Sequence, residues 1–259
     1  MSVSSTILVA DDGAVRTITL NRPDRRNAMT PEMQAELIVA MDEAATSSCR
    51  VVVFAGAGEA FCSGLDLSAL QGMNDKSAEE HRVDAERIAK LFRSLYELPK
   101  PTIAVVHGAA IAGGTGIATL CDFTLAVPAA KFGYTEVRIG FVPAVVSAFL
   151  ALQVGDKRAR DLLLTGRLFD ATEAHRLGLV SEVVACEELQ SRVATLAAVL
   201  AANSPSSLEA TKRLLAVQNK EWLDAAIAAA MDANATARET ADFREGVASF
   251  LEKRKPVWE

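Results

Sequence analysis

The chain has few of the residues that build metal centres. Its 259 residues include four Cys and three His, and no two of the Cys stand in a C-x-x-C pair. Zinc sites are usually made from closely spaced Cys and His, and widely spaced Cys are typical of a reducing compartment. The sequence therefore predicts no metal site and a cytoplasmic location.

Positive charge and long hydrophobic runs are also scarce. The formal net charge is −6, which argues against a broad basic face for nucleic acid. Residues 139–154 form the longest nearly uncharged stretch, which is too short to span a bilayer and is interrupted by Pro143 and Ser147. The first residues lack the basic segment and apolar core of a signal peptide. We expect neither a nucleic-acid partner nor a membrane partner.

What the chain has in quantity is apolar surface for a core. Half of the residues are hydrophobic and 23% are charged, as in a globular protein with one large domain or one domain with a helical appendage. Strand-like segments recur up to about residue 185, and an alanine-rich helical pattern then runs from 187 to 255. This change predicts a division near residue 190, into a region of residues 1–190 and a region of residues 191–259.

Local patterns predict the individual elements. Thr30-Pro31 has an N-cap residue followed by Pro at the first helical position, which predicts a helix to about residue 45. Other segments are assigned from apolar periodicity and turn residues. We expect strands at 6–9, 15–20, 50–55, 103–106, 123–127 and 180–184, and a short strand followed by a loop within 131–143. We expect helices at 77–97, from 144, at 168–177 and after 187.

The stretch from Thr102 to Asp122 combines a buried strand, a glycine-rich turn and a helix start. Gly108, Gly113 and two further glycines place several backbone N–H groups at the positive end of a helix dipole. Such a place stabilises a negative oxygen. The alternative is a tight turn whose small residues only allow close packing.

Glu136 is the conspicuous acid of the following segment. It stands among aromatic and apolar neighbours in residues 131–143, a setting that raises the pKa of a carboxyl group toward the range useful for acid–base catalysis. The alternative is an ion pair with Arg138 or another surface base. The loop at 21–28, with three Arg, is similarly either a solvated surface loop or a basic lip for a phosphorylated ligand.

Several of these segments together resemble the enoyl-CoA hydratase/isomerase (crotonase) family. They are NRPDRRNAM (21–29), AFCSGLDL (60–67), HGAAIAGGTGIATLCD (107–122), KFGYTEVRIGFVP (131–143) and FLEKRK (250–255). The resemblance implies an α/β fold, a spiral of ββα units that carries the acyl-CoA-binding catalytic site in residues 1–190. It also implies that residues 191–259 form a helical oligomerisation region that builds homotrimers, often paired into hexamers.

The resemblance assigns roles to individual residues. The backbone N–H groups of Leu65 and Gly113 would form an oxyanion hole for the thioester carbonyl, and Glu136 matches one of two catalytic glutamates. The coenzyme A path would be lined by Arg22, Arg26, Ala28, Ala60, Cys62, Ser63, Gly64, Asp66, Leu67 and Gly114. Phe250 and Lys253 match positions that reach the coenzyme A of a neighbouring subunit. Coenzyme A enters as part of the substrate, so no separate cofactor is implied.

The second catalytic glutamate of the family falls on Gly116. With Glu136 alone, an isomerase that moves a proton between C2 and C4 has the simplest chemistry. The pattern around Gly116 and Glu136 nevertheless resembles methylglutaconyl-CoA-type hydratases, which also carry Gly there. Hydration of a 2-enoyl-CoA is therefore narrowly favoured, with an isomerase as the alternative and an acyl-CoA binder without turnover as a third possibility.

A hydratase with Gly116 needs another group to hold its water. Backbone groups, Asp66 or Glu59 are candidates by sequence neighbourhood, although both acids are better explained as structural. A serine hydrolase is disfavoured because no G-x-S-x-G occurs. We expect the selectivity for the acyl chain to depend on residues 70–84 and 141–149.

Overall fold

The computed structural model describes residues 5–258, apart from the side chains of residues 67, 68, 74 and 75. A six-stranded sheet has the order β1-β2-β3-β4-β6-β9. Its strands are β1 (Ile7–Asp12), β2 (Val15–Leu20), β3 (Val51–Gly56), β4 (Thr102–Val106), β6 (Phe123–Ala126) and β9 (Glu182–Val183). β1 and β2 form an antiparallel hairpin, and each later strand pairs in parallel with its neighbour. The predicted hairpin and the strands that follow it are confirmed.

A second, three-stranded sheet consists of β5 (Ala109–Ile111), β7 (Lys131–Gly133) and β8 (Leu168–Asp170). The prediction of one helix over residues 168–177 is wrong for its first turn, because β8 pairs antiparallel with β7. In that pairing Phe169 lies opposite Phe132, with 5.8 Å between the ring centroids. Asp170 then caps α7, accepting a hydrogen bond from the Glu173 N–H at 2.8 Å. A distant strand thus decides the conformation of this segment.

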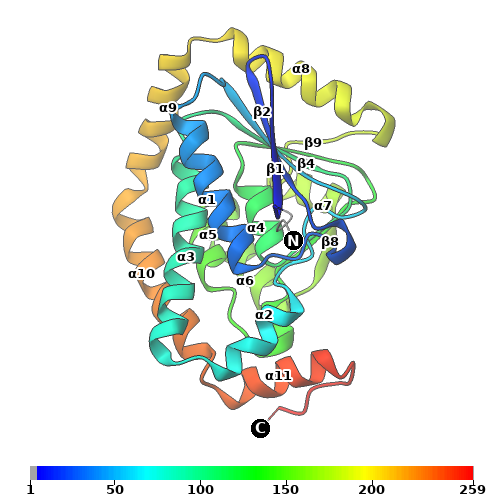
Figure 1. Cartoon of the computed structure of the whole chain (residues 1–259), viewed down its shortest axis with the longest axis vertical. Coiled ribbons are helices and arrows are strands. Elements are labelled where there is room, and N and C mark those ends of the chain that lie inside the picture. The colour runs from blue at the N-terminus through cyan, green and yellow to red at the C-terminus, as the bar shows by residue number, and fades with distance from the viewer. Residues whose placement is uncertain (1–4, 259) are drawn as a thin grey trace.

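Helices connect the parallel strands and cover the sheet (Figure 1). They are α1 (Pro31–Thr46), α2 (Leu67–Gln71), α3 (Ala78–Glu97), α4 (Gly113–Leu120), α5 (Ala144–Val154), α6 (Asp156–Thr165), α7 (Ala171–Arg176), α8 (Leu189–Ala202), α9 (Pro205–Gln218), α10 (Lys220–Ala237) and α11 (Ala241–Leu251). Short 3₁₀ turns are η1 (Pro23–Arg25), η2 (Gly72–Asp75), η3 (Glu136–Ile139) and η4 (Cys186–Glu188). None of the described helices has the length and hydrophobicity to span a membrane.

Helix starts follow the local sequence. The Thr30 hydroxyl accepts a hydrogen bond from the Met33 N–H at 3.2 Å, which caps α1 as predicted. At the start of α3, Ser77 and Glu80 form a reciprocal capping box. These side chains satisfy N–H groups that have no partner inside the helix, so both helices begin where the sequence predicts.

The C-terminal helices pack against the rest of the chain. α8 lies across β3, β4 and β6, while α10 runs beside α3 and α5 at one edge of the molecule (Figure 1). α11 crosses the opposite end from α8 and contacts η3. A small apolar cluster of Leu70, Met73, Phe141, Phe243 and Val247 holds this end together. Because helices on both sides of residue 190 share these contacts, the division at that residue stays a prediction.

Candidate active site

One cavity brings together three segments that are far apart in the sequence. Its wall includes Ser63–Leu65, Ile111–Gly113 and Thr135–Glu136, together with side chains from α3, α5 and α10. The wall is largely apolar, with Phe92 and Val146 among its members. Cavities of this kind, with a few convergent polar groups, are the usual place for ligand binding.

The segment before Leu65 runs along β5. The Cys62 N–H donates to the Ala109 carbonyl at 3.1 Å, and the Cys62 carbonyl accepts from the Ile111 N–H at 2.8 Å. A Cβ on Gly114 would lie 2.5 Å from the Cys62 carbonyl oxygen, so only glycine allows this approach. The glycine turn therefore serves close packing as well as its candidate chemical role.

Two backbone N–H groups of this region are candidates for binding a negative oxygen. Leu65 and Gly113 both lie in the cavity wall, and neither N–H has an acceptor among the described residues. Gly113 is the first residue of α4, where the helix dipole is positive. Free N–H groups at such a position suit the oxyanion of a thioester intermediate. The pairing of these two groups around one oxygen stays a prediction.

Ala112 holds the turn in a conformation that is rare for a residue with a side chain. Its φ is 52° and its ψ is −123°. The Ala112 N–H donates to the Gly133 carbonyl at 2.7 Å, and its carbonyl accepts from the Gly116 N–H at 3.1 Å. These bonds fix the peptide that carries the Gly113 N–H, and stored backbone strain of this kind is concentrated at functional sites.

Glu136 presents a buried carboxylate oxygen to the cavity. Its Oε2 has no hydrogen-bond partner among the described residues, and burial raises the pKa of the carboxyl group to about 7. Arg138 is exposed and forms no described ion pair with it, so the alternative of a surface ion pair is wrong. A carboxyl group with a pKa near neutrality can both accept and release a proton.

The position of Glu136 depends on the C-terminal helix of the same chain. A Cβ on Gly246 in α11 would lie 2.2 Å from the Ile139 carbonyl, and one on Gly140 would lie 2.2 Å from the Asp242 carbonyl. Gly140 also has a φ of +64°, which favours glycine. Backbone therefore packs directly on backbone where α11 meets η3. Nothing in the local sequence pattern indicated this contact.

The place of the second family glutamate is filled by apolar groups. A Cβ on Gly116 would lie 2.5 Å from Phe92 Cε1 and 2.7 Å from Val146 Cγ1. Both side chains belong to the cavity wall, in which Glu136 is the only acid among the described residues. The site is thus built for one carboxylate, and a side chain at residue 116 would displace its wall.

Gly116→Ala is accordingly expected to lower the free energy of unfolding by about 1–3 kcal/mol, because the new methyl group overpacks the site. Gly113→Ala in the same helix is the matched control, since its Cβ would meet only Met29 Cε at 3.4 Å. Urea denaturation of both variants measures the difference. A Gly116→Ala protein as stable as the control would contradict the packing argument.

The predicted site residues divide into two groups. Those in the cavity wall are Ser63, Gly64, Leu65, Gly113, Glu136 and Phe250. Outside that wall lie Arg22, Arg26, Ala28, Ala60, Cys62, Asp66, Gly114, Gly116 and Lys253. The side chain of Leu67 lies outside the described residues. Phe250 flanks the cavity of its own chain, and its reach with Lys253 to a neighbouring subunit stays a prediction.

Several of the residues outside the wall hold the 22–28 loop in place. Arg22 Nη1 donates to the Ala28 carbonyl and to Asp66 Oδ2, the latter at 2.7 Å. Asn27, which the sequence did not single out, is fully buried and donates to the carbonyls of Ala57 and Ala60 at 2.8 Å. The loop is therefore braced against the 57–66 segment, although Arg26 remains exposed.

Asp66 and Glu59, the two acids considered for holding a water, are not available to the cavity, and the described residues form no metal site. Asp66 is committed to the ion pair with Arg22, and Glu59 is exposed and absent from the cavity wall. Within the described part of the chain, no three His, Cys, Asp or Glu side chains gather closely enough to hold a metal ion. Burial raises the pKa of the Cys62 thiol to about 11, so this thiol stays neutral.

Asn234 is a polar cavity residue that sequence reasoning missed. It lies on α10 with 3% of its surface exposed, and its Oδ1 has no partner among the described residues. Gln34 on α1 is likewise buried in the wall, but its Oε1 accepts a hydrogen bond from Arg87 Nε at 2.9 Å. Both stand in ordinary amphipathic helices, where no local signal separates them from other polar residues.

Comparisons with known proteins extend over nearly the whole chain. A model of the enoyl-CoA hydratase/isomerase family matches residues 11–259. A putative enoyl-CoA hydratase of Thermus thermophilus is 43% identical, over 95% of this chain and 98% of its own length. A 1,2-epoxyphenylacetyl-CoA isomerase of Escherichia coli is 33% identical, over 96% and 97% of the two chains. An enoyl-CoA hydratase/isomerase structure from Xanthobacter autotrophicus Py2 superposes with a TM-score of 0.89 at 30% identity, covering 97% and 98%.

Proposed function

The chain belongs to the enoyl-CoA hydratase/isomerase family, and we propose that it adds water to a 2-enoyl-CoA to give a 3-hydroxyacyl-CoA. The observation that carries the proposal is the unpartnered Oε2 of Glu136, buried in a cavity whose wall also contains Leu65 and Gly113. The fold is the α/β crotonase fold that the resemblance implies.

In the proposed reaction the thioester oxygen accepts hydrogen bonds from the N–H groups of Leu65 and Gly113. These donors stabilise the enolate that forms when water adds to C3, and one such donor can contribute about 3 kcal/mol. The Glu136 carboxylate accepts the proton that water loses as its oxygen bonds to C3. The proton is then delivered to C2, so that the net change is the addition of one water.

An isomerase remains the second candidate, supported by the packing at Gly116. Phe92 and Val146 take the space of a second carboxylate, and one carboxyl group is enough to carry a proton between C2 and C4. One relative is named as an isomerase of an acyl-CoA. A binder without turnover is disfavoured, because a raised pKa on a buried acid is typical of a catalytic group.

An absorbance assay of the conjugated thioester separates these functions. With crotonyl-CoA we expect the absorbance to fall, because hydration removes the double bond from conjugation with the carbonyl. With a 3-enoyl-CoA an isomerase would instead raise the absorbance. A rise with the 3-enoyl substrate and no fall with crotonyl-CoA would favour the isomerase, and no change with either would contradict both activities on simple chains.

The predicted homotrimer or hexamer and the cytoplasmic location belong to the same proposal. The oligomer is supported by exposed large apolar side chains on α9 and at the start of α10. They are Leu214, Leu215, Val217 and Trp222. Exposed apolar patches on a folded chain mark surfaces that are covered by a partner, and a second copy of this chain would supply one.

A further inference from the structure

Hydration at this site needs a second group to hold the water, because Glu136 is the only acid in the described cavity wall. The Glu136 carboxylate can accept a hydrogen bond from one O–H of a water, which leaves the other O–H free and the oxygen unaimed. A second acceptor would fix the orientation of the water. Besides Glu136, the polar side chains in the described wall are Gln34, Ser63, Thr135 and Asn234.

Three of these four side chains are engaged elsewhere or come from distant elements. The Gln34 Oε1, its one acceptor, already receives a hydrogen bond from Arg87 Nε at 2.9 Å. The Ser63 hydroxyl is held toward the 22–28 loop, where it donates to the Arg25 carbonyl at 3.5 Å. Asn234 comes from α10, whose main contacts are with α3, α5 and α9 rather than with η3.

Thr135 has a hydroxyl that the fold does not use. The residue precedes η3 in the capping position, but its φ of −95° and ψ of 5° differ from the extended backbone of an ordinary cap, and its side chain does not cap the turn. The hydroxyl has no hydrogen-bond partner among the described residues. Thr135 is half-buried, and its oxygen is not among the fully enclosed polar atoms. A water in the cavity can therefore reach it.

The segment that carries Thr135 joins the two parts of the proposed chemistry. At its start the Gly133 carbonyl accepts from the Ala112 N–H at 2.7 Å, next to the proposed donor Gly113. At its end stands Glu136, directly after Thr135. Consecutive Cα atoms are about 3.8 Å apart, so the hydroxyl is held close to both the oxyanion turn and the acid.

The backbone on both sides of Thr135 is fixed. Tyr134 has 1% of its surface exposed, and its hydroxyl shares a hydrogen bond with Thr119 Oγ1 at 3.1 Å. The Thr135 carbonyl accepts from the Arg138 N–H at 3.0 Å. A polar group on such a braced segment is placed before the substrate arrives, which is what the orientation of a reacting water requires.

We propose that the Thr135 hydroxyl holds the water that adds to C3, in place of a second carboxylate. The inference rests on the proposed function of the site. One O–H of the water donates to Glu136 and the other to Thr135 Oγ1, which directs a lone pair of the water oxygen at C3. As the C3–O bond forms, the O–H bond toward Glu136 breaks, and that proton passes through Glu136 to C2. The hydrogen that faces Thr135 stays on the oxygen and becomes the hydroxyl hydrogen of the product.

Thr135→Val removes the hydroxyl and keeps the size of the side chain. With crotonyl-CoA we expect kcat for hydration to fall about 10- to 100-fold with little change in KM, because the water is lost while the thioester contacts remain. Thr135→Ser keeps the hydroxyl and should restore most of the rate. Thr195→Val is the control, since that exposed hydroxyl on α8 donates to the Ser191 carbonyl of its own helix at 2.8 Å. Full activity of Thr135→Val, or a serine variant as slow as the valine variant, would overturn the inference.

A reaction that adds no water to C3 separates a lost water from a displaced Glu136. Exchange of the C2 hydrogens of butyryl-CoA in D₂O needs the acid and the oxyanion donors alone, and NMR spectroscopy measures it. Thr135→Val should exchange these hydrogens at about the rate of the parent. Equal losses of exchange and hydration would show that Thr135 acts through the shape of η3, and the inference would be wrong. A parent protein that exchanges C2 hydrogens but hydrates no 2-enoyl-CoA would instead contradict the proposed function.

Discussion

Replacement of Glu136 by Gln is expected to lower kcat by about 10³-fold while KM changes little. The amide keeps the size of the side chain but cannot accept the proton that the reaction releases, and a positioned acid or base typically contributes 10²- to 10⁴-fold. Steady-state kinetics on crotonyl-CoA, or on whichever substrate is turned over, measures the change. Glu59→Gln is the matched control, because Glu59 is exposed and lies outside the cavity wall.

If Glu136→Gln retained full turnover, the assignment of Glu136 as the acid–base group would be wrong. The pH dependence provides a second check on the same residue. The ionised carboxylate is the active form, so kcat/KM should fall on the acid side with a midpoint near the pKa of about 7. A profile that is flat from pH 5 to 8 would show that a different group controls the reaction.

The raised pKa of Glu136 also has a consequence for stability. The carboxyl group binds its proton more tightly in the folded chain than at its ordinary value of 4.5, because burial disfavours the charged form. Ionisation therefore destabilises the fold as the pH rises from 4.5 to about 7, by up to about 3 kcal/mol. The Glu136→Gln variant lacks this cost, so it should be more stable than the parent at pH 8 and no more stable at pH 4.

The parts of the site that the sequence predicts are those fixed by neighbouring residues. Thr30-Pro31 defines the start of α1 through a cap and a restricted φ, both local effects. The glycine turn before α4 and the apolar surroundings of Glu136 are also visible within a dozen residues. The roles of Leu65 and Gly113, in contrast, came from resemblance to a family. Almost every residue has a backbone N–H group, so the residue types alone do not indicate which N–H groups bind a ligand.

The parts that could not be predicted depend on contacts between distant segments. β8 forms because Phe169 packs on Phe132, and the same residues alone favour a helix. α11 reaches η3 only because Gly140 and Gly246 remove two side chains from their interface. Phe92 fills the space beside Gly116 from another helix, so the sequence shows a missing glutamate without showing what replaces it.

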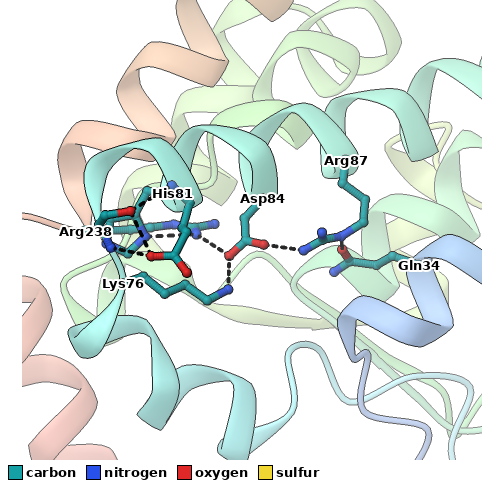
Figure 2. Close-up of polar contacts among 8 residues, drawn as sticks. Gln34, Lys76, His81, Asp84, Arg87 and Arg238 are labelled. Atoms are coloured by element: carbon teal, nitrogen blue, oxygen red, sulfur yellow. Dashed lines mark hydrogen bonds and ion pairs between the residues drawn. The ribbon is translucent and has the colours of Figure 1, made fainter.

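The cluster of Lys76, Asp84, Arg87 and Arg238 illustrates the same limit (Figure 2). Lys76 and Asp84 are close in sequence and could be taken for an ordinary pair on a solvated helix. Arg238 stands 154 residues beyond Asp84 and completes the cluster only after α10 has packed against α3. Its burial, rather than its charge, makes it informative, because a buried guanidinium requires a paired anion such as Asp84, whereas an exposed one does not.

Removal of the Gly113 N–H is the second large effect that we expect. Gly113→Pro deletes one of the two proposed oxyanion donors, and loss of one such donor typically lowers kcat by 10²- to 10³-fold. Gly113 is the first residue of α4, a position where proline is tolerated because its N–H would have no partner within the helix. Single-turnover kinetics with saturating thioester measures the chemical step.

Gly113→Ala distinguishes the loss of the N–H from a change of shape. Alanine keeps the donor, and its methyl group would meet only the flexible end of Met29 at 3.4 Å. If the N–H stabilises the developing charge, the alanine variant should stay within about tenfold of the parent while the proline variant falls far below it. A similar loss in both folded variants would show that the turn acts through its shape. Since the donor matters most as charge develops, the proline variant should lose kcat and kcat/KM together and still bind substrate.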